Sequence, residues 1–231
     1  GQFHANERLP AAKGNRQGNA TEAQVGNRAS GRFELSDKRL SIEEFRFEAG
    51  PVDDPYVANG KATVELGVEP YFSVTATGQQ IRLGDDADQQ GASDTTMAQR
   101  FDIIESLLGS VPLPTMPGEV DIKLPAIVAG GTTVRDVAFP ATTAERGGDI
   151  DKLTASLPGR TTLEANGVFS ARPSLGFNGK LLVAVGQPSG FANWLANDID
   201  APVRRLSNAG VEAKVELTPD KQVLNDLELI L

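Results

Sequence analysis

The chain contains no cysteine, and His4 is its only histidine. Without cysteine there can be no disulfide scaffold, no thiolate-bound metal and no cysteine nucleophile. Because this histidine lies in a polar leader, a Ser-His-Asp triad and any multi-histidine metal site are excluded unless another chain supplies the ligands. Hydrolytic and metal-dependent chemistries that need these side chains are therefore ruled out.

Positive charge and long apolar runs are also scarce. Lys and Arg number 22 against 31 Asp and Glu, and the net charge of −9 argues against binding to a nucleic-acid backbone. The longest apolar run, Leu181–Val185, is far shorter than the roughly 18 residues of a membrane-spanning helix. Residues 1–27 also lack the apolar segment of a signal peptide. Because the chain begins at glycine, we expect it to be an excised piece of a longer protein, the parent chain.

Alternation of apolar and polar residues dominates most of the chain. Runs such as 62–68 and 175–185 place apolar residues at every second position, which predicts strands with one apolar and one polar face. The 24 glycines, 14 prolines and 23% charged residues favour a turn-rich β protein over a helical bundle. Residues 1–28 carry few apolar side chains, so we expect a flexible leader or a loose edge strand there.

Two segments have helical spacing instead. Residues 93–109 carry apolar residues on one stripe, with Asp94 as the N-cap and Gly109 as the stop, which predicts a helix before a proline-rich connector. Residues 191–197 predict one or two further turns, capped by Ser189. We expect such short helices to cap the apolar face of a sheet.

The chain contains an internal repeat. Residues 33–47 align without a gap on 215–229, and a third copy of the second half lies at 134–139. In each copy of this second half, which covers 42–47 and 224–229 in the other two, apolar residues stand at i, i+3 and i+5 with two polar residues in the gap. In a strand this spacing requires a β-bulge, which keeps the apolar face continuous and adds twist. The alternative is a short helical turn.

These patterns predict a mainly β fold. We expect long twisted antiparallel sheets with β-bulges, coiled into a trough or half-open barrel, with one or two short capping helices. Residues 1–28 would be the leader or edge segment, 29–92 the first β repeat, and 93–118 the helix and proline-rich connector. Residues 119–231 would hold the second repeat with a partial third, all packed as one continuous domain.

The apolar side of the predicted sheet is the candidate binding site. A continuous apolar lane can hold an acyl chain without specific polar contacts, since each buried methylene contributes about 0.8 kcal/mol. The alternative is that the same side chains form the sealed core of a β-sandwich. The residues predicted to line the lane are Phe33, Leu35, Val64, Leu66, Val120, Ile122, Leu124, Leu163, Phe169, Phe177, Leu181, Val183, Val215 and Leu217.

The sequence offers little support for other chemistry. The acidic clusters at 53–54 and 85–88 lack the spacing of a calcium-binding loop, and we expect them to be solvated. The glycine pairs 130–131 and 147–148 match no phosphate loop and are expected in hairpin turns. We therefore expect no enzymatic activity, no cofactor and no metal.

Several stretches, taken in their order and spacing, carry a family resemblance. They are Ala29–Leu35, Leu40–Gly50, Asp53–Tyr56, Gly60–Gly67, Leu113–Asp121, Gly130–Val137, Leu157–Ala165 and Phe177–Leu181, followed by Phe191 and Trp194. Together they span roughly residues 29–231 and resemble the C-terminal region of the AsmA family of bacterial envelope proteins.

The resemblance implies a non-catalytic periplasmic module whose parent chain is anchored in the inner membrane. It implies a role in outer-membrane biogenesis or phospholipid transfer through an apolar β-groove. The expected partners are a phospholipid or another acyl-chain lipid and adjacent repeats of the parent chain, with no nucleic acid and no membrane-spanning segment in this piece. The alternative is a structural or interaction β domain with a closed core and no ligand.

Overall fold

A computed structural model describes residues 1–8, 26–49, 55–83, 116–129, 132–144, 146–170, 176–196, 208–218 and 221–230. Within these residues the protein is almost entirely strand, with one short helix, so the predicted mainly β fold is confirmed. The chain divides into two compact units, unit 1 (Gly1–Gln79) and unit 2 (Gln80–Leu231). The helix predicted at 93–109 lies outside the described residues.

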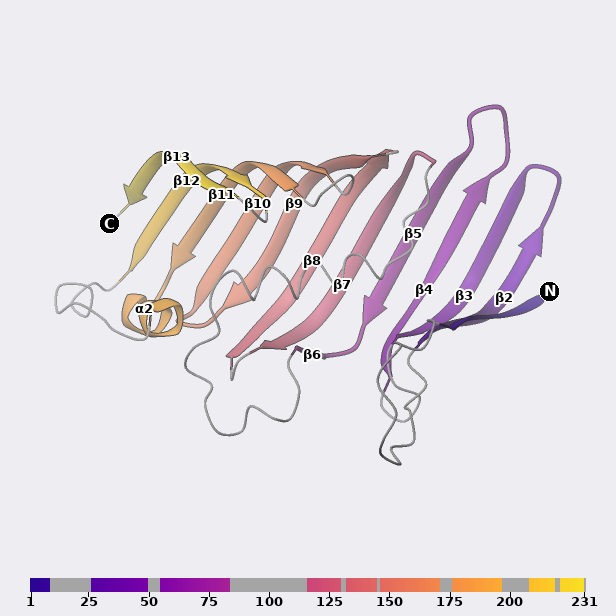
Figure 1. Cartoon of the computed structure of the whole chain (residues 1–231), viewed down its shortest axis with the longest axis horizontal. Helices are drawn as coiled ribbons and strands as arrows, with labels where there is room; N and C mark the ends of the chain where they lie inside the picture. The colour runs from indigo at the N-terminus through magenta and orange to yellow at the C-terminus, as the bar shows by residue number, and fades with distance from the viewer. Residues whose placement is uncertain are drawn as a thin grey trace, which may run out of the picture. The chain divides into compact units, whose positions relative to one another are not determined.

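Unit 1 is an antiparallel meander in which each strand pairs with the next along the chain (Figure 1). Its strands are β1 (Gln2–Arg8), β2 (Gly26–Leu35), β3 (Arg39–Ala49), β4 (Tyr56–Glu65) and β5 (Tyr71–Gly78). β1 is the edge strand of this meander and pairs with β2 over its whole length.

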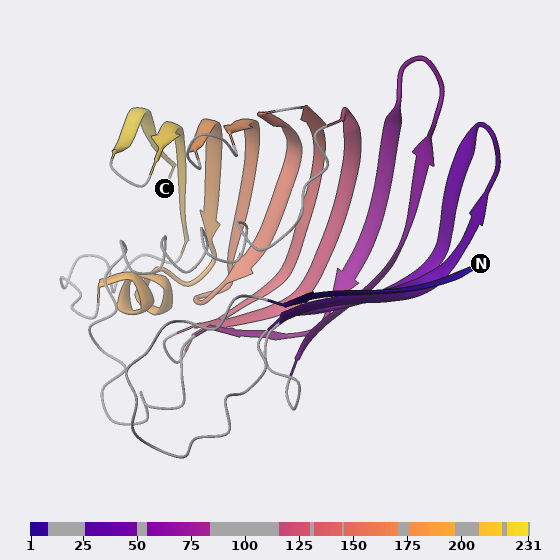
Figure 2. The same cartoon turned by 45° about the vertical axis from the view of Figure 1, so that its right-hand side comes forward.

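Unit 2 is a longer antiparallel meander with one helix. Its elements are β6 (Ile81–Leu83), β7 (Gly118–Ala129), β8 (Thr132–Ala144), β9 (Gly147–Leu157), β10 (Thr161–Ser170), β11 (Gly176–Val185), α2 (Pro188–Ala196), β12 (Ala209–Leu217) and β13 (Gln222–Ile230). The short β6 pairs with β7 in parallel. From β7 to β13 the strand order is linear, and the sheet does not close into a barrel. Its strands bend and twist along their length, as the predicted half-open sheet requires (Figure 2).

The three predicted β-bulges are present. The register shifts fall inside the predicted cores, at 42–45 on β3 against β4, at 135–138 on β8 against β9, and at 225–228 on β13 against β12. Asp136 and Asp226, which occupy equivalent positions in two of these cores, both have a left-handed backbone, with φ of 51° and 50°. The bulges keep the apolar residues on one face through the shift in spacing.

A fourth bulge lies on β9. Ile150, Leu153 and Ala155 repeat the i, i+3, i+5 spacing, and Asp151 and Lys152 fill the gap. The register of β9 against β10 shifts at this point. This bulge is absent from the sequence-based predictions, although the same spacing would have found it.

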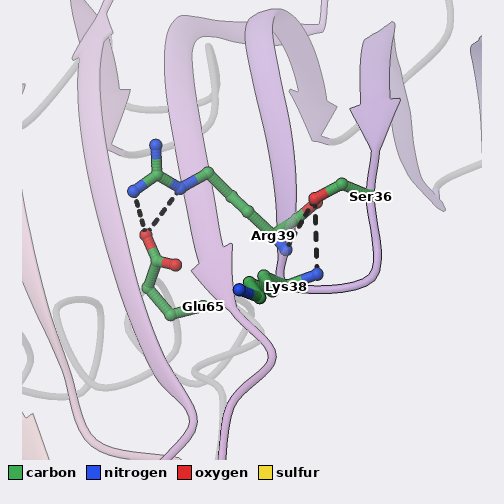
Figure 3. Close-up of polar contacts among 4 residues, drawn as sticks. All are labelled: Ser36, Lys38, Arg39 and Glu65. Atoms are coloured by element: carbon green, nitrogen blue, oxygen red, sulfur yellow. Dashed lines mark hydrogen bonds and ion pairs between the residues drawn. The ribbon is translucent and has the colours of Figure 1, made fainter.

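The turns of the hairpins β2–β3 and β12–β13 contain equivalent hydrogen bonds. The Ser36 N–H donates to the Arg39 carbonyl oxygen at 2.9 Å. The Ser36 Oγ accepts from the Arg39 N–H at 3.0 Å (Figure 3). Thr218 and Lys221 form the same two bonds, at 2.8 and 3.0 Å. The gap-free alignment of the sequence is therefore also an alignment of the structure.

An ion pair recurs in the same two hairpins. Arg32 on β2 contacts Glu44 at the bulge of β3 at 3.1 Å, and Lys214 on β12 contacts Asp226 at the bulge of β13 at 2.6 Å. The four residues occupy matching positions of the repeat. In both hairpins the bulge thus turns a carboxylate towards a cation on the preceding strand.

Helix α2 begins at Pro188, earlier than the predicted start at Phe191, and Ser189 lies in its first turn and is not its cap. Proline suits the first helical position because its missing N–H would have no partner inside the helix. The Gln187 N–H donates to the carbonyl oxygen of Gly159 in the β9–β10 turn at 2.8 Å. Gly159 has a φ of 74°, and a Cβ there would clash with the helix backbone, so α2 packs directly on this turn.

The glycine pair 147–148 forms the first two residues of β9, which corrects its predicted place in a turn. A Cβ on Gly148 would clash with the carbonyl oxygen of Thr142 on β8, and one on Gly147 would clash with that of Phe169 on β10. These positions are glycine because the neighbouring backbones approach too closely for a side chain. The pair 130–131 lies outside the described residues.

Candidate functional site

One face of the unit 2 sheet is apolar from β7 to β13, and we call it the apolar lane of unit 2. Its members follow from the strand register, because residues paired across neighbouring antiparallel strands lie on the same face. None of these members carries a charge. They are Val120, Ile122, Leu124, Val137, Phe139, Ala141, Ile150, Leu153, Ala155, Leu157, Leu163, Ala165, Phe169, Phe177, Leu181, Val183, Val185, Val211, Ala213, Val215, Leu217, Leu224, Leu227 and Leu229.

Unit 1 has a corresponding apolar face. The register places on it, from β2 to β5, Ala29, Gly31, Phe33, Leu35, Leu40, Ile42, Phe45, Phe47, Ala58, Gly60, Ala62, Val64, Phe72, Val74, Ala76 and Gly78. Aside from Leu66, every predicted lining residue lies on the apolar face of its own unit. Leu66 follows the last residue of β4, and its N–H donates to the carbonyl oxygen of Lys38 at 2.8 Å.

The predicted lining residues differ in burial. Val120 and Val215 are buried, with 6% and 3% of their surface exposed. Leu35 and Leu66 are exposed, at 64% and 45%. The remaining ten, which include Phe177, are half-buried. A sealed sandwich core would bury large side chains at these positions almost completely, so the described elements leave the face partly accessible.

In the lane of unit 2 the alanines are buried, whereas the leucines and phenylalanines are half-buried or exposed. Its short members Ala141, Ala155, Ala165 and Ala213 are all less than 10% exposed. Long members such as Leu181 are half-buried. The alanine side chains therefore lie close to the backbone of the sheet, between longer side chains that remain partly accessible to solvent.

Phenylalanine rings cover glycines on these faces. An ideal Cβ on Gly60 would lie 2.8 Å from Cζ of Phe45, its cross-strand partner, and one on Gly148 would lie 2.9 Å from Cε1 of Phe169. Each ring thus lies over the backbone of its glycine, an arrangement that compensates for the missing side chain. Sequence reasoning missed these contacts, and the available signal was a glycine at an apolar position of an alternating strand.

The lane of unit 2 also contains a ring pair. The centroids of Phe139 on β8 and Phe169 on β10 lie 5.9 Å apart, with the rings at 65° in an edge-to-face arrangement. Such pairs are favourable beyond the area that they bury. β9, which lies between these strands, contributes Gly148 under Phe169 and so leaves room for the contact.

Charged side chains lie on the opposite face. In unit 1, Arg39 contacts Glu65 across β3 and β4 at 2.6 Å (Figure 3). Glu48 of the same sheet contacts Arg28 at 2.9 Å and Arg46 at 2.7 Å. The hydrogen bond from Arg46 is the largest cause that lowers the pKa of Glu48 below its usual value, so this carboxyl stays ionised at neutral pH.

Polar groups on the apolar faces are neutral and satisfied. Burial raises the pKa of Tyr56, which lies at the end of the face of unit 1 as the partner of Ala49, so its hydroxyl stays protonated. The hydroxyl groups of the buried Thr143 and Thr161 donate to the carbonyl oxygens of Gly118 and Gly159, at 3.4 and 3.5 Å.

The described residues contain no group of three or more His, Asp or Glu side chains that could hold a metal ion. The acidic clusters at 53–54 and 85–88 lie outside the described part of the chain. Trp194 on α2 contacts Phe191, with ring centroids 5.6 Å apart, and is half-buried. In that part of the chain, no helix is both long and apolar enough to cross a membrane.

Comparison with known proteins gives no match: no protein-family model, no characterised protein and no solved structure is similar to this chain. The apolar lane of unit 2, with its charge-free and half-accessible surface, is the feature of the described structure on which a function can be argued.

Proposed function

We propose that the chain is a non-catalytic lipid-handling module that holds an acyl chain on the apolar lane of unit 2. The observation that carries this proposal is a lane of paired apolar positions from β7 to β13, without charge, whose leucine and phenylalanine side chains are half-buried or exposed. At about 4.8 Å per strand, the lane measures about 29 Å across the strands, close to the roughly 30 Å thickness of a bilayer's hydrocarbon core. That length accommodates a whole acyl chain.

Burial of methylenes supplies the affinity. About 0.8 kcal/mol for each buried methylene gives about 8 kcal/mol for ten of them, before the entropic costs of binding are subtracted. No polar contact is required, so the lane would take acyl chains without strong preference for the headgroup. Unit 2 is favoured over unit 1 because its lane is longer, whereas several central positions of the face of unit 1 are alanine or glycine.

The proposal extends to the cellular role that the sequence resemblance implies. We propose an AsmA-like periplasmic module of a parent chain anchored in the inner membrane, which acts in outer-membrane biogenesis or phospholipid transfer. The half-open sheet with bulges in matching repeat positions supports this proposal, because such a sheet offers a lane that further repeats can extend.

Native mass spectrometry of the purified chain, with lipid analysis of its organic extract, tests the lipid proposal. We expect bound acyl-chain lipid, and we expect the double variant Leu181→Asn, Val183→Thr to lose most of it while circular dichroism shows the sheet intact. Val168→Asp is the matched control, because Val168 is 56% exposed on the opposite face. Lipid-free wild-type chain that also fails to take up a fluorescent fatty acid would contradict the proposal.

One observation favours a second function, a structural or interaction β domain with no ligand. Ala213 and Val215, which lie two residues apart on the same side of β12, are only 2% and 3% exposed. This local core would stabilise the sheet without any lipid. Under this alternative the purified chain would be lipid-free, and the double variant would lower its thermal stability without changing any bound material.

A further inference from the structure

β13 presents an open sheet edge with exposed leucines. Among the described residues it pairs with β12 alone. Leu224, Leu227 and Leu229 lie on the apolar side and are 56%, 61% and 60% exposed. We call these three residues the leucine edge. An exposed strand edge with apolar side chains is a template for the addition of another strand.

The internal repeat shows what normally covers these positions. The equivalents of the leucine edge are Ile42, Phe45 and Phe47 on β3 and Val134, Val137 and Phe139 on β8. All six are half-buried. β3 and β8 each have a following strand, β4 or β9, in addition to the preceding one. Among the described residues β13 has no second antiparallel neighbour of the kind that its two equivalents have, which accounts for the exposure of the leucine edge.

The two existing neighbours show which side chains fit there. Gly60 on β4 is the partner of Phe45, and Ala155 on β9 lies opposite the bulge that contains Val137. Both residues are small, which leaves room for the large side chain that follows the bulge. A strand that fits the leucine edge should therefore carry glycine or alanine opposite Leu227.

The charge at the edge of β13 places a second requirement on a strand that would bind there. On the polar face Glu228 is paired directly with Glu212 of β12, and the ion pairs of the described residues include neither carboxylate. Like charges opposite one another destabilise a sheet. A lysine or arginine on the added strand, next to Glu228, would remove this repulsion.

We infer that the edge of β13 binds an extended segment of a separate polypeptide as an additional antiparallel strand. The segment has glycine or alanine facing the leucine edge and a basic residue beside Glu228. Main-chain hydrogen bonds to the free edge provide affinity, and these two side-chain requirements provide selectivity.

A synthetic peptide with the sequence of residues 56–65 is the probe, because β4 occupies the equivalent place beside β3. In the equivalent register Asn59, the partner of Arg46, would lie beside Glu228. We expect fluorescence anisotropy to show saturable binding of the labelled peptide to the full chain. The Asn59→Lys peptide should bind roughly two- to fivefold more tightly at low salt, and this advantage should fall as salt is added.

Variants of the full chain test whether the peptide binds at the edge of β13. Leu227→Asp should abolish binding without loss of fold, because Leu227 is exposed, whereas Val168→Asp on an inner strand should leave binding unchanged. Three results would overturn the inference: no binding of either peptide, equal binding to Leu227→Asp, or sedimentation that shows a dimer of the wild-type chain which Leu227→Asp dissociates. The last result would assign the edge to a second copy of this chain.

Discussion

At the scale of single residues, an ion pair recurs on the polar face at the bulges of β3 and β13. Lys214 and Asp226 lie on neighbouring strands, with Nζ and Oδ2 2.6 Å apart. The hydrogen bond and then the charge of Lys214 lower the pKa of Asp226 below its ordinary value of 3.8, and Asp226 in turn raises the pKa of Lys214 above 10.5. Both side chains are highly exposed, so the pair adds little to the free energy of unfolding and mainly orients the two side chains.

The sign of each shift predicts a pH window for this pair. Because the folded-state pKa of Asp226 is lowered, its contribution is present above pH 3.8 and is lost as the pH falls through the folded-state pKa. Because that of Lys214 is raised, its contribution is complete below pH 10.5 and is lost as the pH rises through the folded-state pKa. We expect carbon-detected NMR titration of the Asp226 carboxyl to give a midpoint below 3.8.

The variant Lys214→Met tests the cause of the low midpoint. Without the ammonium group, the Asp226 midpoint should move up towards 3.8. Glu228→Gln is the control, since it removes a carboxylate from the same strand outside this pair. A midpoint that stays low in Lys214→Met would mean that the backbone of the bulge, and not the lysine, shifts the pKa.

At the level of strands and turns, each β-bulge bends its strand and keeps the apolar face of that strand continuous. Asp136 on β8 has a φ of 51°, which a residue with an ordinary side chain adopts at a cost of about 1–2 kcal/mol. Aspartate tolerates this backbone better than most residues, and glycine tolerates it best. The left-handed backbone at the bulge therefore restricts which residues can occupy this position.

Two substitutions at Asp136 separate conformation from charge. Asp136→Gly should leave stability unchanged or raise it by up to about 1 kcal/mol, and Asp136→Val should lower it by about 1–2 kcal/mol. Both remove the carboxylate, so their difference reports the backbone alone. Urea unfolding of unit 2, followed by fluorescence of Trp194, measures both effects. Equal stability of the two variants would contradict a left-handed backbone at this bulge.

Strand identity and bulges could be predicted from the sequence because both leave a local periodic signal. Alternation predicts the faces, and the i, i+3, i+5 spacing predicts the bulges at 42–47, 134–139 and 224–229. The contact of Phe45 with Gly60 could not be predicted in this way. It depends on which residues of β3 and β4 lie opposite one another, and each bulge shifts that register by an amount that neither strand's sequence states.

For the molecule as a whole, the sequence could predict an apolar surface but not its accessibility. Phe177, Leu181 and Val183 alternate in the same way whether a second layer covers them or not. Their half-buried state follows from the linear order of β7 to β13, a property of the assembled sheet.

Ligand-linked stability tests whether the accessible lane of unit 2 acts as a binding site in the whole chain. A ligand that binds only the folded state at 100 times its Kd stabilises it by about 2.7 kcal/mol, which corresponds to a rise of about 5–10 °C in Tm for a chain of this size. We expect lauroyl lysophosphatidylcholine, kept below its micelle concentration, to produce a rise of this order in the melting of unit 2, followed by Trp194 fluorescence.

The same measurement assigns the effect to one unit. Val183→Thr on the lane of unit 2 should reduce the rise in Tm, whereas Val64→Thr on the apolar face of unit 1 should preserve it, and both changes keep the shape of the side chain. Val64 and Val183 are both half-buried, so the loss of intrinsic stability should be similar in the two variants. If the two variants lose the lipid-dependent rise equally, the lysolipid acts on both faces without selectivity, and the lane of unit 2 is not a dedicated acyl-chain site.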